Sequence, residues 1–380
     1  MSGPGTRLCG LDLLRAIAVV WVMLFHSYLV GGLGEDWAWL SRYGWMGVDL
    51  FFVLSGFLIG SQVLQPLADG RRLSFGDFYL RRAFRILPAF WVMLALYWFV
   101  PPIREAPGLE PAWKFLAFVV NLDIDYRHNA AFSHAWSLCV EEHFYLVFPL
   151  LALGLGRRLG PWTLALLVLG LVAAGIALRS GAWLHGHRVD PDMQLRNWFV
   201  EDIYYPTWNR LDGLLAGVVL ACVRVFRPRA WSVLQRGGNG LLLLGLATVA
   251  TAMWLFADRT GLLGNAIGWP VLALGMALLV LAGAGPGSVI GRFAVPGTGW
   301  IAGASYSLYL SHKAVFHLVD THAGGWLEGR GLLAFATYAL ATVLAGAALH
   351  YVAERPFLRL RVRLQKGAAD RAALPARTPA

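Results

Sequence analysis

The stretch LDLLRAIAVVWVMLFHSYL, residues 11–29, is apolar over nearly its whole length and decides the fold class. An α-helix needs about 20 such residues to cross the roughly 30 Å hydrocarbon core of a bilayer. The run is too long for the apolar part of a secretory signal peptide, and no small-residue cleavage site follows it. We therefore expect a membrane-spanning helix that remains in the protein.

The composition extends this prediction to the whole chain. Of its 380 residues, 58% are hydrophobic and only 14% are charged, whereas soluble domains carry roughly 25% charged residues. A soluble globule of this size has too little interior to hide so much apolar surface, and the same composition excludes a disordered chain. We expect an all-α fold, a polytopic membrane helical bundle surrounded by the lipid bilayer.

Ten apolar stretches are long enough to cross a bilayer. They are residues 11–31, 46–65, 84–102, 138–156, 162–179, 208–226, 240–257, 268–285, 300–320 and 331–353. Of the 32 Lys and Arg residues, 20 fall on the side of the N-terminus and nine on the opposite side. Basic residues collect in cytoplasmic loops, so both termini are expected in the cytoplasm, in agreement with an even number of crossings.

The net charge of +10 follows from the same asymmetry, and we expect no nucleic-acid partner. Residues 357–380 are rich in Arg and Ala, and they predict a basic, disordered cytoplasmic tail against anionic lipid. The cysteines Cys9, Cys139 and Cys222 lack the spacing of metal ligands. The sequence therefore predicts neither a metal site nor a disulfide framework.

The ionisable residues Arg15 and His26 lie inside the first span. Each such residue costs roughly 2.5 kcal/mol or more in a bilayer, so its presence suggests a functional role. The two are eleven residues apart, which places them on one helix face about 16 Å apart along the axis. The alternative is structural: Arg15 extends to a lipid phosphate, and His26 bonds a neighbouring carbonyl group.

His26 is the candidate general base, because a neutral imidazole accepts a proton from a hydroxyl near neutral pH. A base needs a partner that orients it or balances its charge, and the candidates are Asp49, Glu141 and Glu142. All three lie near the outer start of a span, in the same half of the membrane as His26. Adjacent helical residues point about 100° apart, so only one of the two glutamates is expected to face the site.

The segment FYLRRAFRILPAFW, residues 78–91, places basic residues at the cytoplasmic side. Arg82 and Arg85 share a helix face, and Arg81 is adjacent. Paired guanidinium groups match phosphate oxygens, which favours a binding site for a phosphorylated cytosolic ligand. The alternative is that these residues only anchor the chain at the cytoplasmic face.

Further polar residues occur in later spans. In NRLDGLLAG (209–217), Arg210 either balances a glutamate or contacts the acceptor, or it forms a structural ion pair inside the membrane. The segment GASYSLYLSHKAVFHL (303–318) carries His312 and Lys313. Its small and hydroxyl-bearing residues are interpreted as contacts between helices.

Several motifs occur in order along the chain. They are GVDLFFVLSGFLI (47–59), RRAFRILPAFW (81–91), WSLCVEEHFYLVFPLL (136–151), NRLDGLLAG (209–217), SYSLYLSH (305–312) and ERPF (354–357). With these motifs, residues 8–358 resemble the bacterial membrane acyltransferase-3 family of O-acyltransferases. In that resemblance Arg15 and His26 match the family's functionally required pair, and Arg82 with Arg85 matches its Arg-x-x-Arg motif.

The resemblance implies an enzyme of the bacterial cytoplasmic membrane. It would transfer an acetyl or other short acyl group from cytosolic acyl-CoA to a hydroxyl of a surface or exported glycan, a lipid or a small molecule. Residues 8–356 would form the transmembrane acyltransferase domain. Many members carry an additional extracytoplasmic domain, and because this sequence stops at a short tail we expect the stand-alone kind.

The predicted mechanism begins with acyl-CoA, whose phosphates bind Arg82, Arg85 and Arg81. His26, oriented by one of the three carboxylates named above, deprotonates the acceptor hydroxyl. The hydroxyl then attacks the thioester directly, or an acyl-histidine intermediate forms first. No cofactor is expected to stay bound.

Two further roles and one alternative function complete the predictions. Ser137 or Asn209 would donate a hydrogen bond to the oxyanion of the tetrahedral intermediate, and Arg210 would contact the acceptor. The alternative from another functional class is a transporter or flippase of a glycan or acyl compound, since buried charges are typical of transporters as well.

Overall fold

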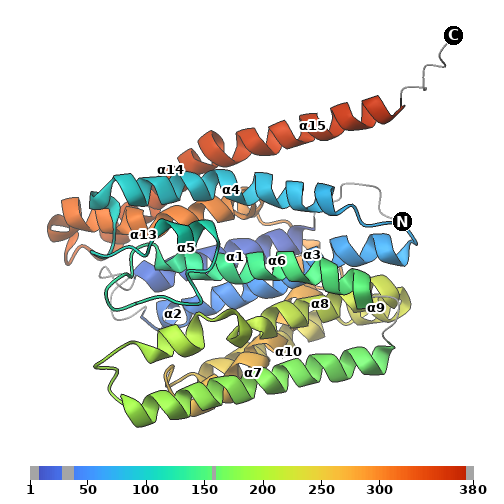
Figure 1. Ribbon diagram of the computed structural model, residues 1–380, viewed down its shortest axis with the longest axis horizontal. Coiled ribbons are helices and arrows are strands. Elements are labelled where there is room, and N and C mark those ends of the chain that lie inside the picture. The colour runs from blue at the N-terminus through green and yellow to red at the C-terminus, as the bar shows by residue number, and fades with distance from the viewer. Residues whose placement is uncertain (1–7, 28–37, 156–159, 374–380) are drawn as a thin grey trace.

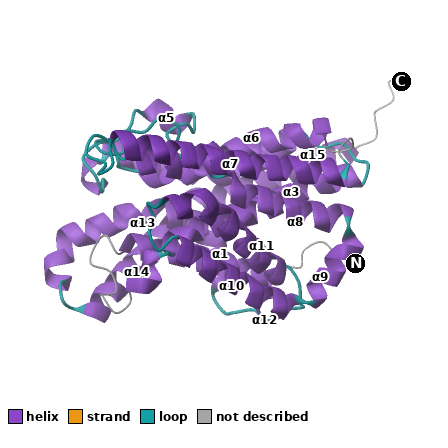
Figure 2. Cartoon of the chain, turned by 90° about the horizontal axis from the view of Figure 1, so that it is seen from below, coloured by secondary structure: helices purple, strands orange, loops and turns teal. Residues whose placement is uncertain are grey.

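The computed structural model describes residues 8–27, 38–155 and 160–373, and this part of the chain is built from helices, without a β-strand. The long helices run side by side along the long axis of the molecule (Figure 1). The loops gather at the two ends of the helices, and the short helix α5 (Ala112–Leu116) lies among them at one end (Figure 2). The predicted all-α polytopic membrane bundle is confirmed.

The long helices are α1 (Cys9–Ser27), α3 (Gly47–Ala68), α4 (Phe75–Phe99), α6 (Trp136–Leu155), α7 (Pro161–Val189), α8 (Leu211–Phe226), α10 (Gly238–Leu255), α11 (Trp269–Gly283), α13 (Thr298–Leu327), α14 (Gly331–Leu349) and α15 (Arg355–Ala373). The shorter ones are α2 (Ala38–Arg42), α9 (Pro228–Arg236) and α12 (Val289–Arg292). Segments of π-helix cover Phe199–Tyr204, Gly264–Gly268 and His350–Glu354. Short 3-10 turns cover Gly44–Met46, Pro101–Ile103, Ser133–Ala135 and Thr207–Asn209.

Each of the ten predicted spans coincides with a long helix over most of its described residues. Eight segments of the described chain are long and apolar enough to cross a membrane. The other two predicted spans correspond to α8, which is short at 16 residues, and to α13, which has 30 residues but is rich in polar side chains. Both nevertheless pack inside the bundle, α8 against α3 and α13 against α1.

Glycines bring α3 and α8 into close contact. A Cβ atom on Gly56 would lie 2.2 Å from the carbonyl oxygen of Leu214, and one on Gly217 would lie 2.3 Å from that of Val53. In a membrane, where lipid is as apolar as the side chains, such close backbone approach is a main source of helix association. The contact fixes the depth of α8 relative to α3 and thereby aligns their polar residues.

The Gly56→Ala variant is expected to lower the free energy of unfolding by about 1–3 kcal/mol, the usual cost of overpacking, because the added methyl group meets backbone that cannot rotate away. Gly170 of α7 has no atom within 4 Å of an added Cβ. Gly170→Ala should therefore be neutral or slightly stabilising. Thermal midpoints of the two variants in the same detergent check this, and equal midpoints would contradict the packing account.

The C-terminal segment differs from the disordered tail that the sequence predicted. Residues 355–373 form α15, and the Nε2 atom of Gln365 donates a hydrogen bond of 2.6 Å to Oδ1 of Asp77 on α4. Arg, Ala and Leu dominate the segment, and all three are good helix formers. Residues 374–380 of the predicted tail lie outside the described residues.

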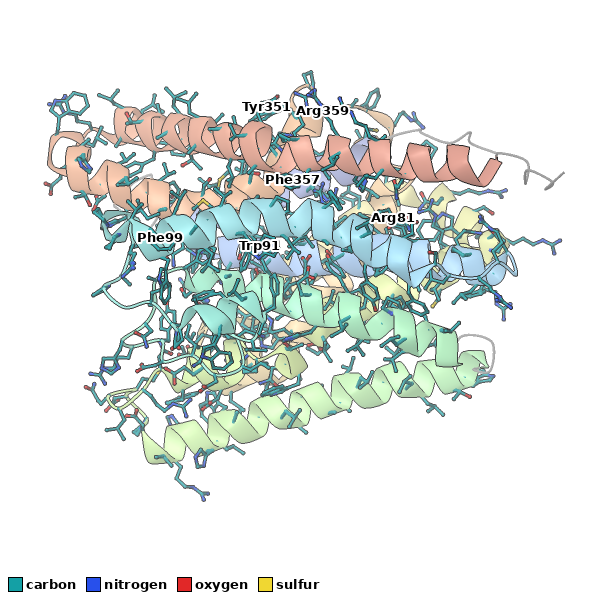
Figure 3. All side chains as sticks on the ribbon, turned by 45° about the horizontal axis from the view of Figure 1, so that its top comes forward. Arg81, Trp91, Phe99, Tyr351, Phe357 and Arg359 are labelled. Carbon is teal, nitrogen blue, oxygen red and sulfur yellow. The ribbon has the colours of Figure 1, made fainter. Side chains whose placement is uncertain are left out.

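The outer face of α4 and α15 has the character of a lipid-facing surface. Figure 3 looks onto this face, where Trp91, Phe99 and Phe357 are 51%, 78% and 43% exposed. Along α4 the labelled side chains change from Phe99 and Trp91 to Arg81. This sequence from apolar to basic matches the predicted orientation, with the start of α4 at the cytoplasmic side.

Candidate active site

At the outer end of α1, His26 is paired with a histidine of α13. The Nδ1 atom of His26 lies 2.9 Å from Nε2 of His312. The sequence analysis expected Asp49, Glu141 or Glu142 as the partner of His26, and the structure places all three elsewhere. An imidazole, rather than a carboxylate, therefore orients the candidate base.

Backbone carbonyls assign the protons of this pair in its neutral form. Nδ1 of His312 lies 2.6 Å from the carbonyl oxygen of Tyr309, which only accepts, so Nδ1 carries the proton and Nε2 accepts. His26 must then donate from Nδ1, which also lies 3.1 Å from the carbonyl oxygen of Val22. Among the described residues no hydrogen bond reaches Nε2 of His26. Its lone pair is left available for a proton.

A third histidine, His134, stands at the start of α6 next to the pair. Its ring centroid is 5.2 Å from that of His312, and its Nε2 atom donates to the carbonyl oxygen of Leu310 at 3.1 Å. Its Nδ1 atom faces Oε1 of Glu105 at 4.0 Å, and the same oxygen pairs with Nζ of Lys313 at 2.8 Å. We name this set the outer histidine cluster: His26, His134, His312, Lys313 and Glu105.

A strained backbone holds the cluster in place. Phe132 has φ of 55°, in the left-handed region that residues other than glycine rarely adopt. Its N–H donates to Oε1 of Glu105 at 3.1 Å, and its ring stacks on Tyr97 at 4.5 Å between centroids. Strain of this kind persists only where the surroundings enforce it, and it concentrates at functional sites.

A second group of charges lies deeper in the bundle, towards the cytoplasmic side. We name it the central charge cluster, and its members are Arg15, Arg82, Arg85, Glu141, Glu142, Tyr145 and Glu354. Arg15 of α1 is within electrostatic reach of Arg85 and Glu141. Arg15 and His26 thus share a helix face, as predicted, but serve different clusters.

Glu141 and Glu142 belong to this central cluster and not to the surroundings of His26. The hydroxyl of Tyr145 donates to Oε2 of Glu141 at 2.5 Å, and the guanidinium of Arg82 lies 5.5 Å from the centre of the Tyr145 ring. The reason is helix register: His134 precedes α6 and lies level with His26, whereas Glu141 is seven residues further along, roughly 10 Å deeper.

The three predicted phosphate-binding arginines are engaged to different degrees. Arg81 forms an ion pair with Asp77 one turn earlier on α4. Arg85 pairs at 3.5 Å with Glu354, which is fully buried and also accepts hydrogen bonds from Ser307 and His350. Arg82 makes only a 3.5 Å hydrogen bond to Gln62, and its Nε atom has no partner in the described chain.

Asp49 and Arg210 form a buried ion pair of their own, at 2.8 Å, between α3 and α8. The guanidinium of Arg210 lies over the ring of Trp269 at 3.8 Å and over that of Tyr204 at 4.5 Å. The aromatic rings and Asp49 together stabilise the Arg210 guanidinium within the helix interface and leave none of its faces open to a ligand. The structural interpretation therefore describes Arg210 better than acceptor contact, and Asp49 balances Arg210 instead of His26.

The two predicted oxyanion donors, Ser137 and Asn209, lie in different parts of the structure. The side-chain amide of Asn209 donates to the backbone carbonyl oxygen of Asp202. The backbone carbonyl oxygen of Asn209 accepts from Arg179 at 2.8 Å, and Arg179 also bonds Asp212. Ser137 lies by the outer histidine cluster, with its hydroxyl 2.7 Å from that of Tyr309. Of the two, only Ser137 contacts a member of the outer histidine cluster, through the backbone carbonyl oxygen of His134 at 3.4 Å.

Sequence reasoning missed four members of the outer cluster: His134, His312, Lys313 and Glu105. His312 ends the motif SYSLYLSH, and His134 stands two residues before WSLCVEEHFYLVFPLL, so both had a signal in the ordered motifs. Glu105 lies in an outer loop, and no sequence motif marked it as a candidate site residue. Within the described ranges, no group of three or more His, Cys, Asp or Glu residues has the arrangement of a metal site.

The sequence is similar to those of known O-acetyltransferases. The O-acetyltransferase OatA of Staphylococcus aureus is 27% identical over 331 residues, which cover 82% of this chain and 51% of that protein. The peptidoglycan O-acetyltransferase OatA of Listeria monocytogenes is 30% identical over 334 residues, which cover 81% of this chain and 49% of that protein. The chain thus spans about half the length of the curated relatives it matches.

No solved structure matches the chain significantly. The family described as an acyltransferase domain matches residues 10–351, which include every member of both clusters except Glu354. The family resemblance seen in the ordered motifs is confirmed. This multi-pass membrane protein, with bacterial relatives, therefore belongs to the acyltransferase family that this domain defines.

Proposed function

We propose that the chain is an O-acyltransferase of the bacterial cytoplasmic membrane. It moves an acetyl or other short acyl group from cytosolic acyl-CoA to a hydroxyl of a cell-envelope glycan built from N-acetylated hexosamines, as in peptidoglycan. Family membership and relatives described as O-acetyltransferases support the reaction class. A relative described as acting on peptidoglycan supports the acceptor.

The observation that carries the proposal is the hydrogen-bonded chain from Tyr309 through His312 to His26. This chain fixes the proton of the neutral His26 ring on Nδ1 and leaves Nε2 with a free lone pair. An imidazole held in one tautomer by a second group is the arrangement of a general base. His312 has the positioning role here, because it acts through His26.

The donor is proposed to bind at the central charge cluster. Arg82 has the least engaged guanidinium of the three arginines, and Arg85 is 29% exposed despite its pair with Glu354. A guanidinium binds phosphate oxygens through paired N–H groups, which suits the phosphates of coenzyme A. Arg81 is already paired with Asp77, so it adds to the positive electrostatic potential at the site more than it binds the phosphates directly.

The proposed reaction balances without an oxidant or a metal. Nε2 of His26 takes the proton of the acceptor hydroxyl, and the oxygen attacks the thioester carbonyl. The tetrahedral intermediate collapses, the carbon–sulfur bond breaks, and the imidazolium returns the proton to the thiolate. The products are an O-acyl glycan and free coenzyme A.

The test uses the full chain in lipid nanodiscs with radiolabelled acetyl-CoA and a soluble β-1,4-linked N-acetylglucosamine tetramer. We expect free coenzyme A and acetylated sugar in equal amounts, and no transfer from acetyl phosphate. Transfer from acetyl phosphate but not from acetyl-CoA would overturn the donor. Sugar crossing a sealed vesicle without acetylation would favour the transporter interpretation.

Arg82→Ala is expected to raise the KM for acetyl-CoA about tenfold with little change in kcat, because a charge-assisted hydrogen bond to phosphate is lost. Arg71 is a matched control, since it is exposed, lies on the same cytoplasmic side and pairs with Asp69 at 2.6 Å. Arg71→Ala should leave the KM unchanged. If both variants behave like the wild type, the arginines only anchor the chain.

A further inference from the structure

A cavity of about 370 Å³ opens at the outer end of the bundle, between the end of α4 and α13. Its lining residues are Pro101, Arg104, Glu105, Ala106, Pro107 and His317. The volume falls within the size range of small-ligand pockets, and the lining mixes apolar prolines with three ionisable side chains. The mechanism proposed above uses none of these side chains.

Two of the lining residues connect the cavity to the outer histidine cluster. Glu105 faces the cavity and pairs with Lys313, while its Oε1 atom lies 4.0 Å from Nδ1 of His134. His317 is four residues after Lys313 on α13, one helical turn away on the same face. The cavity therefore ends within about one helical turn of His312 and its partner His26.

Three buried polar atoms, one on the lining residue Glu105 and two on residues beside it, lack a hydrogen bond of normal geometry within the described chain. They are Oε2 of Glu105, Nδ1 of His134 and the hydroxyl of Tyr97. Tyr97 is fully buried, and its hydroxyl lies close enough to the Glu105 carboxylate to interact with it, although the two groups do not meet the geometry of a normal hydrogen bond. Buried polar groups are nearly always paired, so three unpaired ones in one place point to an absent binding partner.

The chemistry of these atoms identifies the class of that partner. A carboxylate oxygen only accepts, and Nδ1 of His134 also accepts, because Nε2 carries the proton that it donates to Leu310. Two acceptors facing one gap require a donor between them, whereas the hydroxyl of Tyr97 can donate to an oxygen. A hydroxyl both donates and accepts, so it meets both requirements.

The rest of the cavity offers donors to the same kind of ligand. Arg104 uses Nε and Nη2 to cap the end of α4 at the carbonyls of Tyr97 and Trp98, and its Nη1 atom makes no hydrogen bond with a described residue. The imidazole of His317 is likewise without a hydrogen-bond partner in the described ranges. A sugar ring carries hydroxyls in several directions and fits this alternation of donors and acceptors.

We propose that this outer cavity is the acceptor subsite, which holds an N-acetylated hexosamine unit of the glycan through Glu105, His134, Tyr97 and His317. The proposal rests on the proposed function for its substrate class. One hydroxyl of the sugar occupies the gap at Glu105 and His134, and a neighbouring hydroxyl is thereby presented to Nε2 of His26.

Tyr97→Phe gives the sharpest test, because it removes only a hydroxyl that makes no hydrogen bond of normal geometry in the free protein. A residue with a purely structural role would lose nothing, and the thermal midpoint should stay equal or rise. We expect the dissociation constant for the N-acetylglucosamine tetramer, measured by calorimetry in nanodiscs, to increase about fivefold. The KM for acetyl-CoA should not change.

His317→Ala is the second variant, with His322→Ala as its matched control. Both histidines lie on α13, but His322 is exposed beyond the cavity, and its Nδ1 atom bonds the carbonyl oxygen of Leu318. We expect a fivefold or greater loss of sugar affinity for His317→Ala and none for His322→Ala. Unchanged affinity in both Tyr97→Phe and His317→Ala, or a wild-type protein that does not bind the tetramer, would overturn the subsite.

The two proposals fail in different ways. The subsite is measured by equilibrium sugar binding without a donor, whereas the proposed function is measured by release of coenzyme A coupled to acetylated sugar. Sugar binding that depends on Tyr97 and His317, in a protein that does not turn over acetyl-CoA, would support the subsite and refute the donor. Turnover with variants that bind sugar as well as the wild type would do the reverse.

Discussion

Replacing His26 with alanine is expected to abolish acyl transfer while the protein still folds and inserts into the membrane. A positioned general base contributes about 10²–10⁴-fold to the rate, and without Nε2 the hydroxyl that attacks the thioester loses the base proposed to take its proton. The measurement is acetylated sugar formed per mole of purified protein in nanodiscs. The thermal midpoint, recorded on the same sample, should shift little.

His322→Ala serves again as the control, because it removes an exposed imidazole from the same side of the membrane. Added imidazole should restore part of the activity of His26→Ala, since a small base can occupy the space of the missing ring. A structural role for His26 would give no such rescue. Wild-type transfer by His26→Ala would refute the base assignment outright.

Asp49→Ala is expected to have the largest effect on stability. It leaves the Arg210 guanidinium, which is 2% exposed, without a counter-ion in the helix interface. Breaking a buried pair from one side typically costs about 3–5 kcal/mol, because the remaining charge is uncompensated. The thermal midpoint and the yield of monodisperse protein in detergent measure this loss.

A second substitution separates charge imbalance from loss of packing. The double variant Asp49→Leu with Arg210→Met removes both charges and should recover much of the lost stability. The exposed Asp69, which pairs with Arg71 at the cytoplasmic face, provides the control, and Asp69→Ala should cost at most about 1 kcal/mol. Equal losses for Asp49→Ala and Asp69→Ala would contradict the account.

The fold was predictable because membrane crossing imposes a local rule. About 20 apolar residues are required wherever a helix crosses the membrane. The apolar run that contains Arg15 and His26 could therefore be identified as a span without knowing which helices pack against it. The rule is weakest for α13, where buried serines and His312 lower the hydropathy of a helix that packs on protein more than on lipid.

The site was predicted only in part, because it depends on which residues of different helices share one depth. His26 was a candidate functional residue because of its cost in the membrane, but the same argument could not identify its partner. Glu141 looked suitable because the outer end of its span was taken as the level of His26, whereas His134 occupies that level. Glu105 has no periodic pattern around it, and only the tertiary fold brings it to Lys313.

The spacing of Arg15 and His26 on α1 has a consequence for the reach of the donor. Because an α-helix is rigid, the eleven residues between Arg15 and His26 fix their separation along the helix axis at about 16 Å. A donor with its charged head at the level of Arg15 and Arg82 delivers its acyl carbon to His26 only at the end of an arm of that length. This separation favours acyl donors in which a long, slender chain joins the phosphate to the acyl group. It excludes donors in which the acyl group is bonded directly to the phosphate.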